Sequence, residues 1–170
     1  MTWTCSSEPY LRPQGGGAAD AWTQAGGTQR IIGADEMIPP GDVAEALGID
    51  TQTPAVTRRR LLSLGGQPFE VASSWWPASV ASGTALAESR RIRGGAVTLL
   101  AEMGYIVYRT IEDIWAASAS DEESNLLDIP PGTPVLVIFR TAFDTNDRPF
   151  QIDVMTRRAN ARQRYQLAAN

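Results

Sequence analysis

The chain is an acidic polypeptide of ordinary globular composition. Its 170 residues are 43% hydrophobic and 20% charged, and its net charge is −4 at pH 7. A chain of this length can bury a core of its own and is typical of one domain. The acidic balance lacks the basic footprint of a free-standing DNA-binding protein. It shows no apolar stretch of the roughly 20 residues that a membrane helix needs and no secretion-signal pattern, so we expect a cytoplasmic protein.

The residue types that the sequence lacks exclude several chemistries. It has no histidine, its only cysteine is Cys5, and all 15 of its basic residues are arginine. Zinc sites are built mainly from Cys and His, and the common nucleophilic triads need His, so both are excluded. Without lysine, Schiff-base chemistry is excluded too. Because no carboxylate cluster, P-loop or GxGxxG loop appears, we expect no catalytic residue, no metal and no cofactor.

The first half of the chain predicts an irregular arm followed by short strands. Residues 1–27 carry glycine clusters and no sustained period, which predicts an arm without regular structure. Asp42 is predicted to cap a short helix that Gly48 ends. The paired glycines at 65 and 66 supply the positive φ angles of a tight hairpin. The predicted elements are strands over 29–37, 54–64 and 69–76 and a helix over 43–47.

The second half adds one longer helix and the remaining strands. Apolar residues spaced i, i+3, i+4, i+7 from Ala96 to Met103 predict a helix that Gly104 ends. Ser120 and Glu123 form a capping box for a second helix. Strands are predicted over 105–116, 135–143 and 150–157. The sum is an α+β domain over 28–170, with a mostly antiparallel sheet of five to six strands and short helices packed on it.

The start of the predicted helix at Ala96 is one candidate binding site. Arg93, Gly94 and Gly95 lead directly into it. A helix N-terminus favours anions, and glycines let a ligand approach the backbone closely. The alternative is a solvated basic loop that the glycines simply terminate.

Polar residues inside predicted strands are the other candidates. Alternation places Arg58 and Arg60 on the same face of their strand, and an inward-pointing arginine needs a protein or ligand partner. The alternative is a solvated edge. Asp153 and Gln151 share a face of the apolar final strand, where Asp153 either lines a pocket or pairs with a neighbouring arginine.

Three segments in a fixed order carry a resemblance to a known family. RRRLLSLGGQPFEVASSWWPASVASGTALAE combines an Arg-rich strand, a Gly turn and an aromatic-Pro ending, GGAVTLLAEMGY is a Gly-led helix, and PPGTPVLVIFRTAFDTNDRPFQIDVM is a final hairpin. Together, over Gln29 to Leu167, they resemble the UTRA domain, the effector-binding module of the HutC subfamily of GntR transcription regulators. The resemblance implies a chorismate-lyase-like fold, a homodimer, and a ligand pocket between the sheet and the Gly-led helix.

The resemblance also implies which positions line that pocket. Phosphosugar-sensing relatives use two arginines, a glutamate, a serine, a tyrosine and an acidic residue of the last strand. These positions fall here on Arg60, Leu62, Ala72, Gly95, Val97 and either Gln151 or Asp153. Only Arg60 and Asp153 have the residue type that these relatives have at the matching position. This difference disfavours a phosphosugar and favours a less charged or more apolar effector of unknown identity.

We therefore expect a ligand-sensing regulatory domain. A GntR regulator places a winged helix-turn-helix of roughly 70 residues before this domain. Here only the arm over 1–27 precedes it, so we expect no direct DNA binding by this chain, with a separate DNA-binding regulator as one potential partner. Two alternatives remain open: a dimerisation module with a vestigial pocket, and an enzyme on the chorismate-lyase-like fold.

Overall fold

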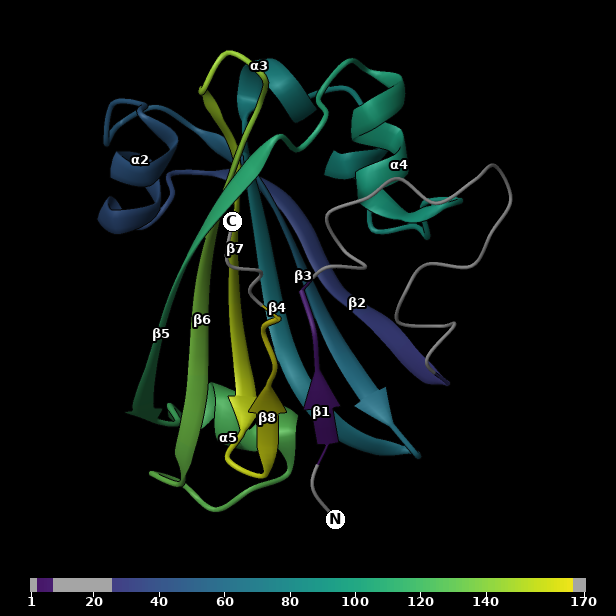
Figure 1. Ribbon diagram of the computed structural model, residues 1–170, viewed down its shortest axis with the longest axis vertical. Helices are drawn as coiled ribbons and strands as arrows, with labels where there is room; N and C mark the ends of the chain where they lie inside the picture. The colour runs from purple at the N-terminus through teal and green to yellow at the C-terminus, as the bar shows by residue number, and fades with distance from the viewer. Residues whose placement is uncertain (1–2, 8–25, 167–170) are drawn as a thin grey trace.

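The structure, a computed structural model, describes residues 3–7 and 26–166 (Figure 1). In chain order the elements are β1 (Trp3–Cys5), β2 (Gly27–Met37), α2 (Gly41–Leu47), β3 (Ala55–Leu64), β4 (Gln67–Pro77), α3 (Ala78–Ala81), the 3-10 helix η2 (Ala85–Ala87), α4 (Gly95–Glu102), β5 (Arg109–Ser118), α5 (Asp121–Leu127), β6 (Pro134–Phe143), β7 (Pro149–Arg158) and β8 (Ala161–Gln163).

Six strands form one antiparallel sheet in the order β2-β3-β4-β7-β6-β5. The chain leaves β4 through α3, η2 and α4 and re-enters the sheet at its far edge as β5. Strands β1 and β8 pair in parallel as a separate two-stranded sheet. The predicted α+β class, with a sheet of five to six mostly antiparallel strands and short helices, is confirmed.

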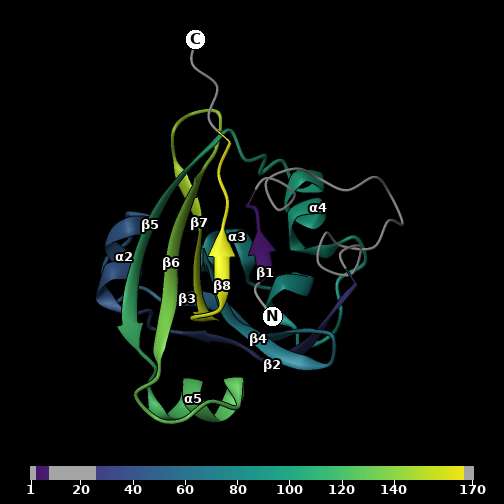
Figure 2. The ribbon, with the colours of Figure 1, turned by 60° about the horizontal axis from the view of Figure 1, so that its bottom comes forward.

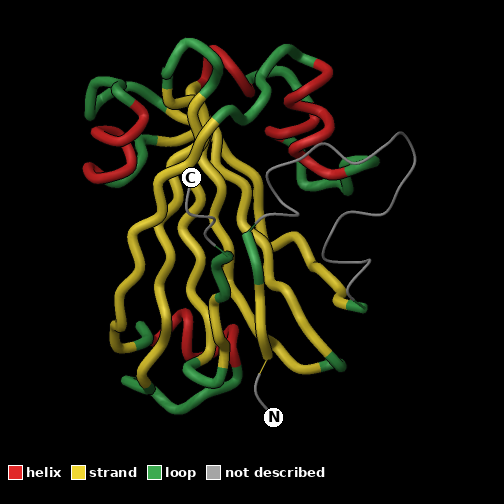
Figure 3. Tube along the Cα trace, in the orientation of Figure 1, coloured by secondary structure: helices red, strands yellow, loops and turns green. Residues whose placement is uncertain are grey.

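The two faces of the large sheet are covered differently. On the face called the α4 face below, Trp76, Leu100 and Phe150 form a core cluster with residues of α3 and η2. Farther along that face, Phe69 and Met155 pack beside Cys5 of β1 and Ala161 of β8, and both short strands lie in front of the sheet in Figure 2. The opposite face packs against α2 and α5. The described helices gather at the two ends of the sheet (Figure 3), and the strands β1 and β8 cover part of the α4 face between them.

The β3–β4 hairpin turns as the sequence predicts. Gly65 and Gly66 have φ of +57° and +80°, and the strands pair up to Leu64 and Gln67. Two consecutive positive φ angles are those of a type I′ turn, whose twist matches that of the strands. The pairing then shifts at a bulge between Leu62 and Ser63, so the turn and the bulge together set the face on which each polar residue of the two strands lies.

The predicted cap of α2 is wrong. Pro40, not Asp42, is the N-cap residue, and its carbonyl oxygen accepts the first helical hydrogen bond from Ala44 at 2.9 Å. Asp42 lies in the first turn, where its Oδ1 accepts from the amide of Val43 at 2.9 Å. An acidic residue in the first turn stabilises a helix through the dipole without being its cap.

Three other segments differ from the prediction. Residues 105–108 are not in a strand, because the side chains of Tyr105 and Val107 pack into the core beside α4. The single turns α3 and η2 were not expected, since one turn is too short to show an apolar period. Within the predicted irregular arm, residues 3–5 form β1. This strand pairs with β8, which lies near the other end of the sequence. Residues 8–25 of the arm lie outside the described residues.

Candidate functional site

A row of polar side chains crosses the middle of the α4 face. The register places Arg58 of β3 opposite Ser74 of β4, and Ser74 opposite Asp153 of β7. Asp153 lies opposite Arg140 of β6, which lies opposite Glu112 of β5. Residues directly opposite each other in antiparallel strands project from the same face. Five strands therefore bring these five side chains into one line.

Asp153 is the centre of a buried hydrogen-bonded group. Ser74 Oγ donates to its Oδ1 at 2.5 Å, and Gln151 Nε2 donates to its Oδ2 at 2.7 Å. Arg60 Nη2 donates to Ser74 Oγ at 2.8 Å, and Trp76 Nε1 donates to Gln151 Oε1 at 2.9 Å. The hydrogen bonds to the carboxylate thus come from neutral donors, which orient it, and its countercharges lie one step farther away.

Arg140 is a buried cation between two carboxylates. Its Nε donates to Glu112 Oε1 at 2.5 Å, and its Nη2 donates to Ser7 Oγ at 2.9 Å. Its Nη1 lies 3.8 Å from Asp153 Oδ2, close enough for charge attraction but too far for a hydrogen bond. The Arg140 side chain is only 5% exposed. Such a buried cation is tolerable because both carboxylates compensate it.

The outer end of the row contacts segments near both chain ends. The hydroxyl of Tyr165 donates to Glu112 Oε2, and Gln163 Nε2 donates to Ser7 Oγ at 2.7 Å. Burial alone would raise the pKa of Glu112, but the Arg140 charge and hydrogen bonds from neighbours, Tyr165 first, bring it below its usual value. Burial and the bond to Glu112 raise the pKa of Tyr165 to about 12. Glu112 is therefore ionised and Tyr165 neutral at pH 7.

A cleft between α4 and the sheet exposes part of this row. It is narrow in this structure, with room for about one water molecule. The walls are largely apolar and come from α4, the segment that follows it, and β6 and β7. The floor carries charged and amide groups from the row. The lining residues are Val97, Leu100, Tyr105, Val107, Arg140, Ala142, Phe150, Gln151 and Asp153.

The start of α4 is built on two glycines with positive φ. Gly94 is the N-cap residue at φ +76°, and Gly95 follows at +83°. Thr98 packs on this turn, where its Oγ1 donates to the carbonyl oxygen of Gly94 at 2.8 Å. A Cβ on Gly94 would lie 3.2 Å from the Thr98 side chain. The glycine thus lets the chain turn sharply into the helix that walls the cleft.

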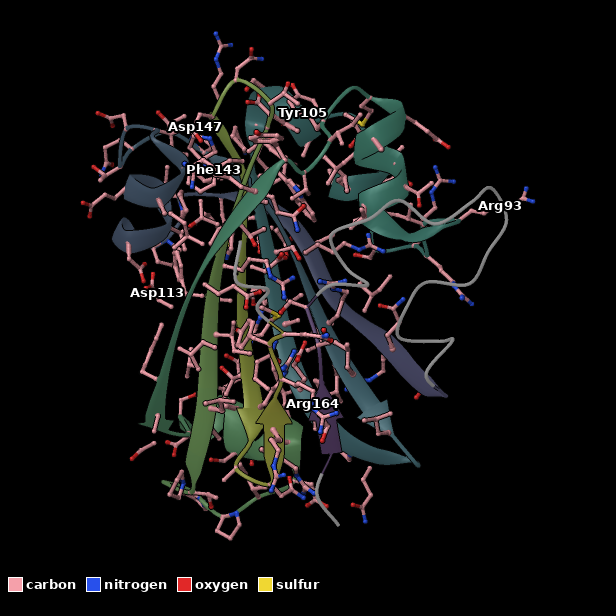
Figure 4. The ribbon with its side chains drawn as sticks, viewed as in Figure 1. Arg93, Tyr105, Asp113, Phe143, Asp147 and Arg164 are labelled. Carbon is pink, nitrogen blue, oxygen red and sulfur yellow. The ribbon has the colours of Figure 1, made fainter. Side chains whose placement is uncertain are left out.

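The arginines that precede α4 and those of β3 have different roles. Arg58 Nη2 donates to the carbonyl oxygen of Arg90 at 2.6 Å, and its Nη1 donates to that of Glu88. Burial, with the charge of Arg60 as a further cause, lowers the pKa of Arg58 to about 10. Arg58 therefore anchors the loop that leads to α4. Arg93 is exposed and points away from the sheet in Figure 4.

Metal-binding and membrane-spanning features are absent from the part of the chain that the structure describes. Over residues 3–7 and 26–166, no group of three or more His, Cys, Asp or Glu side chains is placed to hold a metal ion. None of the helices in these ranges is long and apolar enough to cross a membrane.

Comparison with known proteins identifies the family. The model of the UTRA domain matches residues 26–162. The chain belongs to the UTRA family. An uncharacterised HTH-type transcriptional regulator of Streptomyces coelicolor is 32% identical over 102 residues, which are 58% of this chain and 38% of that protein. An HTH-type transcriptional regulator of Mycobacterium tuberculosis is 26% identical over 135 residues, 76% of this chain and 46% of that protein.

Solved structures share the fold of this UTRA domain. The ligand-binding domain of a GntR-family regulator from Bordetella bronchiseptica has a TM-score of 0.73 and 26% identity, covering 85% of this chain and 91% of that one. The effector domain of PhnF from Mycobacterium smegmatis has a TM-score of 0.76 and 20% identity, covering 93% and 99%. The chain spans 38% to 49% of the length of the curated relatives it matches. These relatives are transcription regulators, which points away from an enzymatic role.

The UTRA domain brings only some of the predicted site residues together. Val97, Gln151 and Asp153 line the cleft, and Arg60 reaches Asp153 through Ser74. The remaining predicted residues lie around it: Ala72 is buried opposite Arg60, Ala96 packs on the core, Gly94 and Gly95 form the helix start, Arg58 holds the loop, and Arg93 faces solvent.

Arg140 is the main residue that the sequence analysis missed. It is the one charged side chain in β6, and it lies opposite the predicted Asp153. A charged residue in a strand that is apolar on both faces is the signal that could have found it. Tyr105 and Val107 were missed because they were assigned to a strand.

Proposed function

We propose that this UTRA domain is the effector-sensing part of a GntR regulator of the HutC subfamily and that its effector occupies the cleft beside α4. The observation that carries the proposal is the buried polar row at the floor of an apolar-walled cleft. Ligand pockets combine mostly apolar walls with a few precisely placed polar groups. Asp153 and Arg140 are such groups, since both line the cleft and both are held in place by hydrogen bonds from neighbouring side chains.

The cost of burying these groups supports the same proposal. Replacing a buried ion pair by apolar residues of similar volume is often neutral or stabilising, so the row is not needed for a stable sheet. Of its members, Arg140 and Asp153 line the cleft, Ser74 and Glu112 bond to them, and Arg58 holds the loop before α4. A ligand that bonds to these two side chains would use an arrangement that folding alone does not require.

A thermal-shift screen tests the proposal. We expect at least one metabolite to raise the melting temperature by about 5 °C or more near one hundred times its Kd, because a ligand bound only to the folded state stabilises it. Val97→Phe places a ring in the cleft and should abolish the shift. Ala159→Phe, in the exposed turn between β7 and β8, adds the same ring elsewhere and should leave the shift intact.

The other outcomes identify the alternatives. If no compound in a broad library shifts the melt, or if Val97→Phe and Ala159→Phe respond alike, the chain is a dimerisation module and the cleft is vestigial. Turnover of any compound, lost in Asp153→Asn, would instead support an enzyme on this fold. We expect no turnover, because the hydroxyl that donates to Asp153 is that of Ser74, which is buried and does not line the cleft.

Dimerisation is part of the proposal. Strand β5 is an edge of the sheet, and it presents Ile111, Ile114 and Trp115 with exposures of 47%, 38% and 45%. An unpaired edge with large apolar side chains is a site where a second chain adds. The occupant that fits a UTRA domain is a second copy of this chain. We expect the protein in the cytoplasm, because a regulator meets its DNA there, either directly or through a separate DNA-binding partner.

A further inference from the structure

The charges at the floor of the cleft balance one another. Two guanidinium groups, of Arg60 and Arg140, are joined through short contacts to two carboxylates, of Glu112 and Asp153. Among the described residues, Arg58 is a further cation on this face, and its donors are used by backbone carbonyls of the loop before α4. Each of these four side chains therefore has an opposite charge close by, and none needs a charged ligand to compensate it.

The two floor residues still have capacity for hydrogen bonds. Each carboxylate oxygen of Asp153 accepts one bond here and can accept another. Within the described residues, Nη1 of Arg140 donates no hydrogen bond, since its distance to Asp153 is 3.8 Å. The floor therefore offers an acceptor and a donor side by side, below the apolar side chains of Leu100 and Phe150.

We propose that the effector is a small molecule without net charge. It presents a hydroxyl or N–H donor to Asp153 and an oxygen acceptor to Nη1 of Arg140, with an apolar part against Val97, Leu100 and Phe150. This inference rests on the proposed function, since it takes the cleft as the effector site. A phosphorylated ligand is disfavoured, because Arg60 is already bonded to Ser74 and Arg140 is already paired with two carboxylates, so its charge would lie beside Asp153 without a cation of its own.

The start of α4 brings neither Arg90 nor Arg93 into the cleft. Arg93 points into solvent, and Arg90 pairs with Glu88 outside the cleft. The amide of Gly95 already donates to the carbonyl oxygen of Ile92 at 3.1 Å. An anion in the cleft would thus meet one free arginine donor group and one carboxylate, rather than a set of cations.

Inorganic phosphate is the probe that tests the inference. The melting temperatures of the wild type, Asp153→Asn and Asp113→Asn are measured in phosphate and in chloride at equal ionic strength and pH 7. Phosphate stabilises proteins without binding, so the measured quantity is the difference between variants. We expect Asp153→Asn to gain about 2–4 °C over the wild type at roughly five times the Kd for phosphate, because the repelling charge is gone and Arg140 is left partly unpaired. Asp113→Asn removes the same charge from an exposed position on β5 and should behave as the wild type.

Three results would overturn the inference. The first is a rise in the wild-type melting temperature in phosphate that Val97→Phe abolishes. The second is an Asp153→Asn variant whose melting temperature responds to phosphate no more than that of the wild type. The third is an equal rise in Asp153→Asn and Asp113→Asn. If Asp153→Asn does not fold, a library of small fragments sorted by charge is screened for binding to the wild type, and only hits that Val97→Phe abolishes are counted. A majority of phosphorylated compounds among these hits overturns the inference. A majority of uncharged compounds supports it. An absence of such hits contradicts the proposed function, whereas anionic hits contradict only the effector class.

Discussion

Arg140 donates from its Nε to Oε1 of Glu112 at 2.5 Å across the β5–β6 pair, and the two side chains are 5% and 8% exposed. This contact joins a residue that lines the cleft to the edge strand of the sheet. Through Ser7 and Tyr165 it also reaches the segments at either end of the described chain. The pair therefore connects the floor of the cleft to the segments that follow β1 and β8.

Glu112→Gln should destabilise the fold strongly. The change keeps the shape of the side chain but removes the main countercharge of a buried guanidinium, which typically costs about 3 kcal/mol or more. Urea denaturation monitored by circular dichroism measures the loss. Glu122→Gln is the matched control, because the side chains of Glu122 and Arg59 form an ion pair at 62% and 30% exposure. The control should cost no more than about 1 kcal/mol, and equal losses in the two variants would contradict a buried role for Glu112.

The carboxylate of Glu112 should also contribute to the loss of folding stability at low pH. Because the folded-state pKa of Glu112 lies below its ordinary 4.5, its contribution is fully present above pH 4.5 and is lost as pH falls through the folded value. The pKa of Glu123 is also lowered: burial would raise it, but bonds from Thr156 and Ser120 outweigh that effect. Urea midpoints measured from pH 6 down to pH 3 should fall less steeply in Glu112→Gln than in the wild type. Parallel curves would show that Glu112 titrates normally in the folded state.

Gly94→Ala should destabilise the start of α4 beyond the cost of its backbone angle. An alanine at φ +76° costs about 1–2 kcal/mol, and here its Cβ would also press on Thr98 at 3.2 Å. Gly132→Ala is the control, with a similar φ of +72° and no atom within 4 Å of the added Cβ. Denaturant unfolding should show a larger loss for Gly94→Ala, and amide exchange in α4 should rise only in that variant. If Gly132→Ala is the more damaging change, the contact with Thr98 is unimportant.

The sequence predicts the sheet well because local signals agree with the fold. The Gly65-Gly66 turn and the alternation in β6 and β7 are set by short-range sterics, and the capping box of α5 forms as predicted between Ser120 and Glu123. The site is less predictable because it depends on strand order. Arg140 and Asp153 become neighbours only once β6 and β7 pair, and Ser7 joins them from more than one hundred residues away in the sequence.

The same reason explains the misplaced candidates. Arg58 and Arg60 share a face as alternation predicts, yet one holds a loop and the other holds Ser74. Neither side chain lines the cleft, because what each one meets depends on where α4 and its loop pack, and a strand pattern does not contain that information.

Trp115→Glu should weaken self-association of this chain. A charge in place of the indole on β5 would be buried without a partner if a second copy covers that edge. Sedimentation velocity should give a dimer for the wild type and a shift towards monomer for the variant at the same concentration. Met37→Glu is the control, since Met37 is 50% exposed on β2, at the opposite edge of the sheet. A monomeric wild type, or equal dissociation in both variants, would place the interface elsewhere or remove it.

The chain alone should not bind DNA with measurable salt-dependent affinity. Its 15 arginines are outnumbered by 19 acidic residues, and Arg58, Arg140 and Arg157 are buried in internal contacts. DNA affinity comes largely from cations that displace counterions from phosphates, so a net charge of −4 opposes association. Fluorescence anisotropy of a labelled duplex should show no binding at micromolar protein in either low or physiological salt. A Kd below about 1 µM that weakens steeply as salt rises would contradict this prediction, because it is the signature of phosphate contacts.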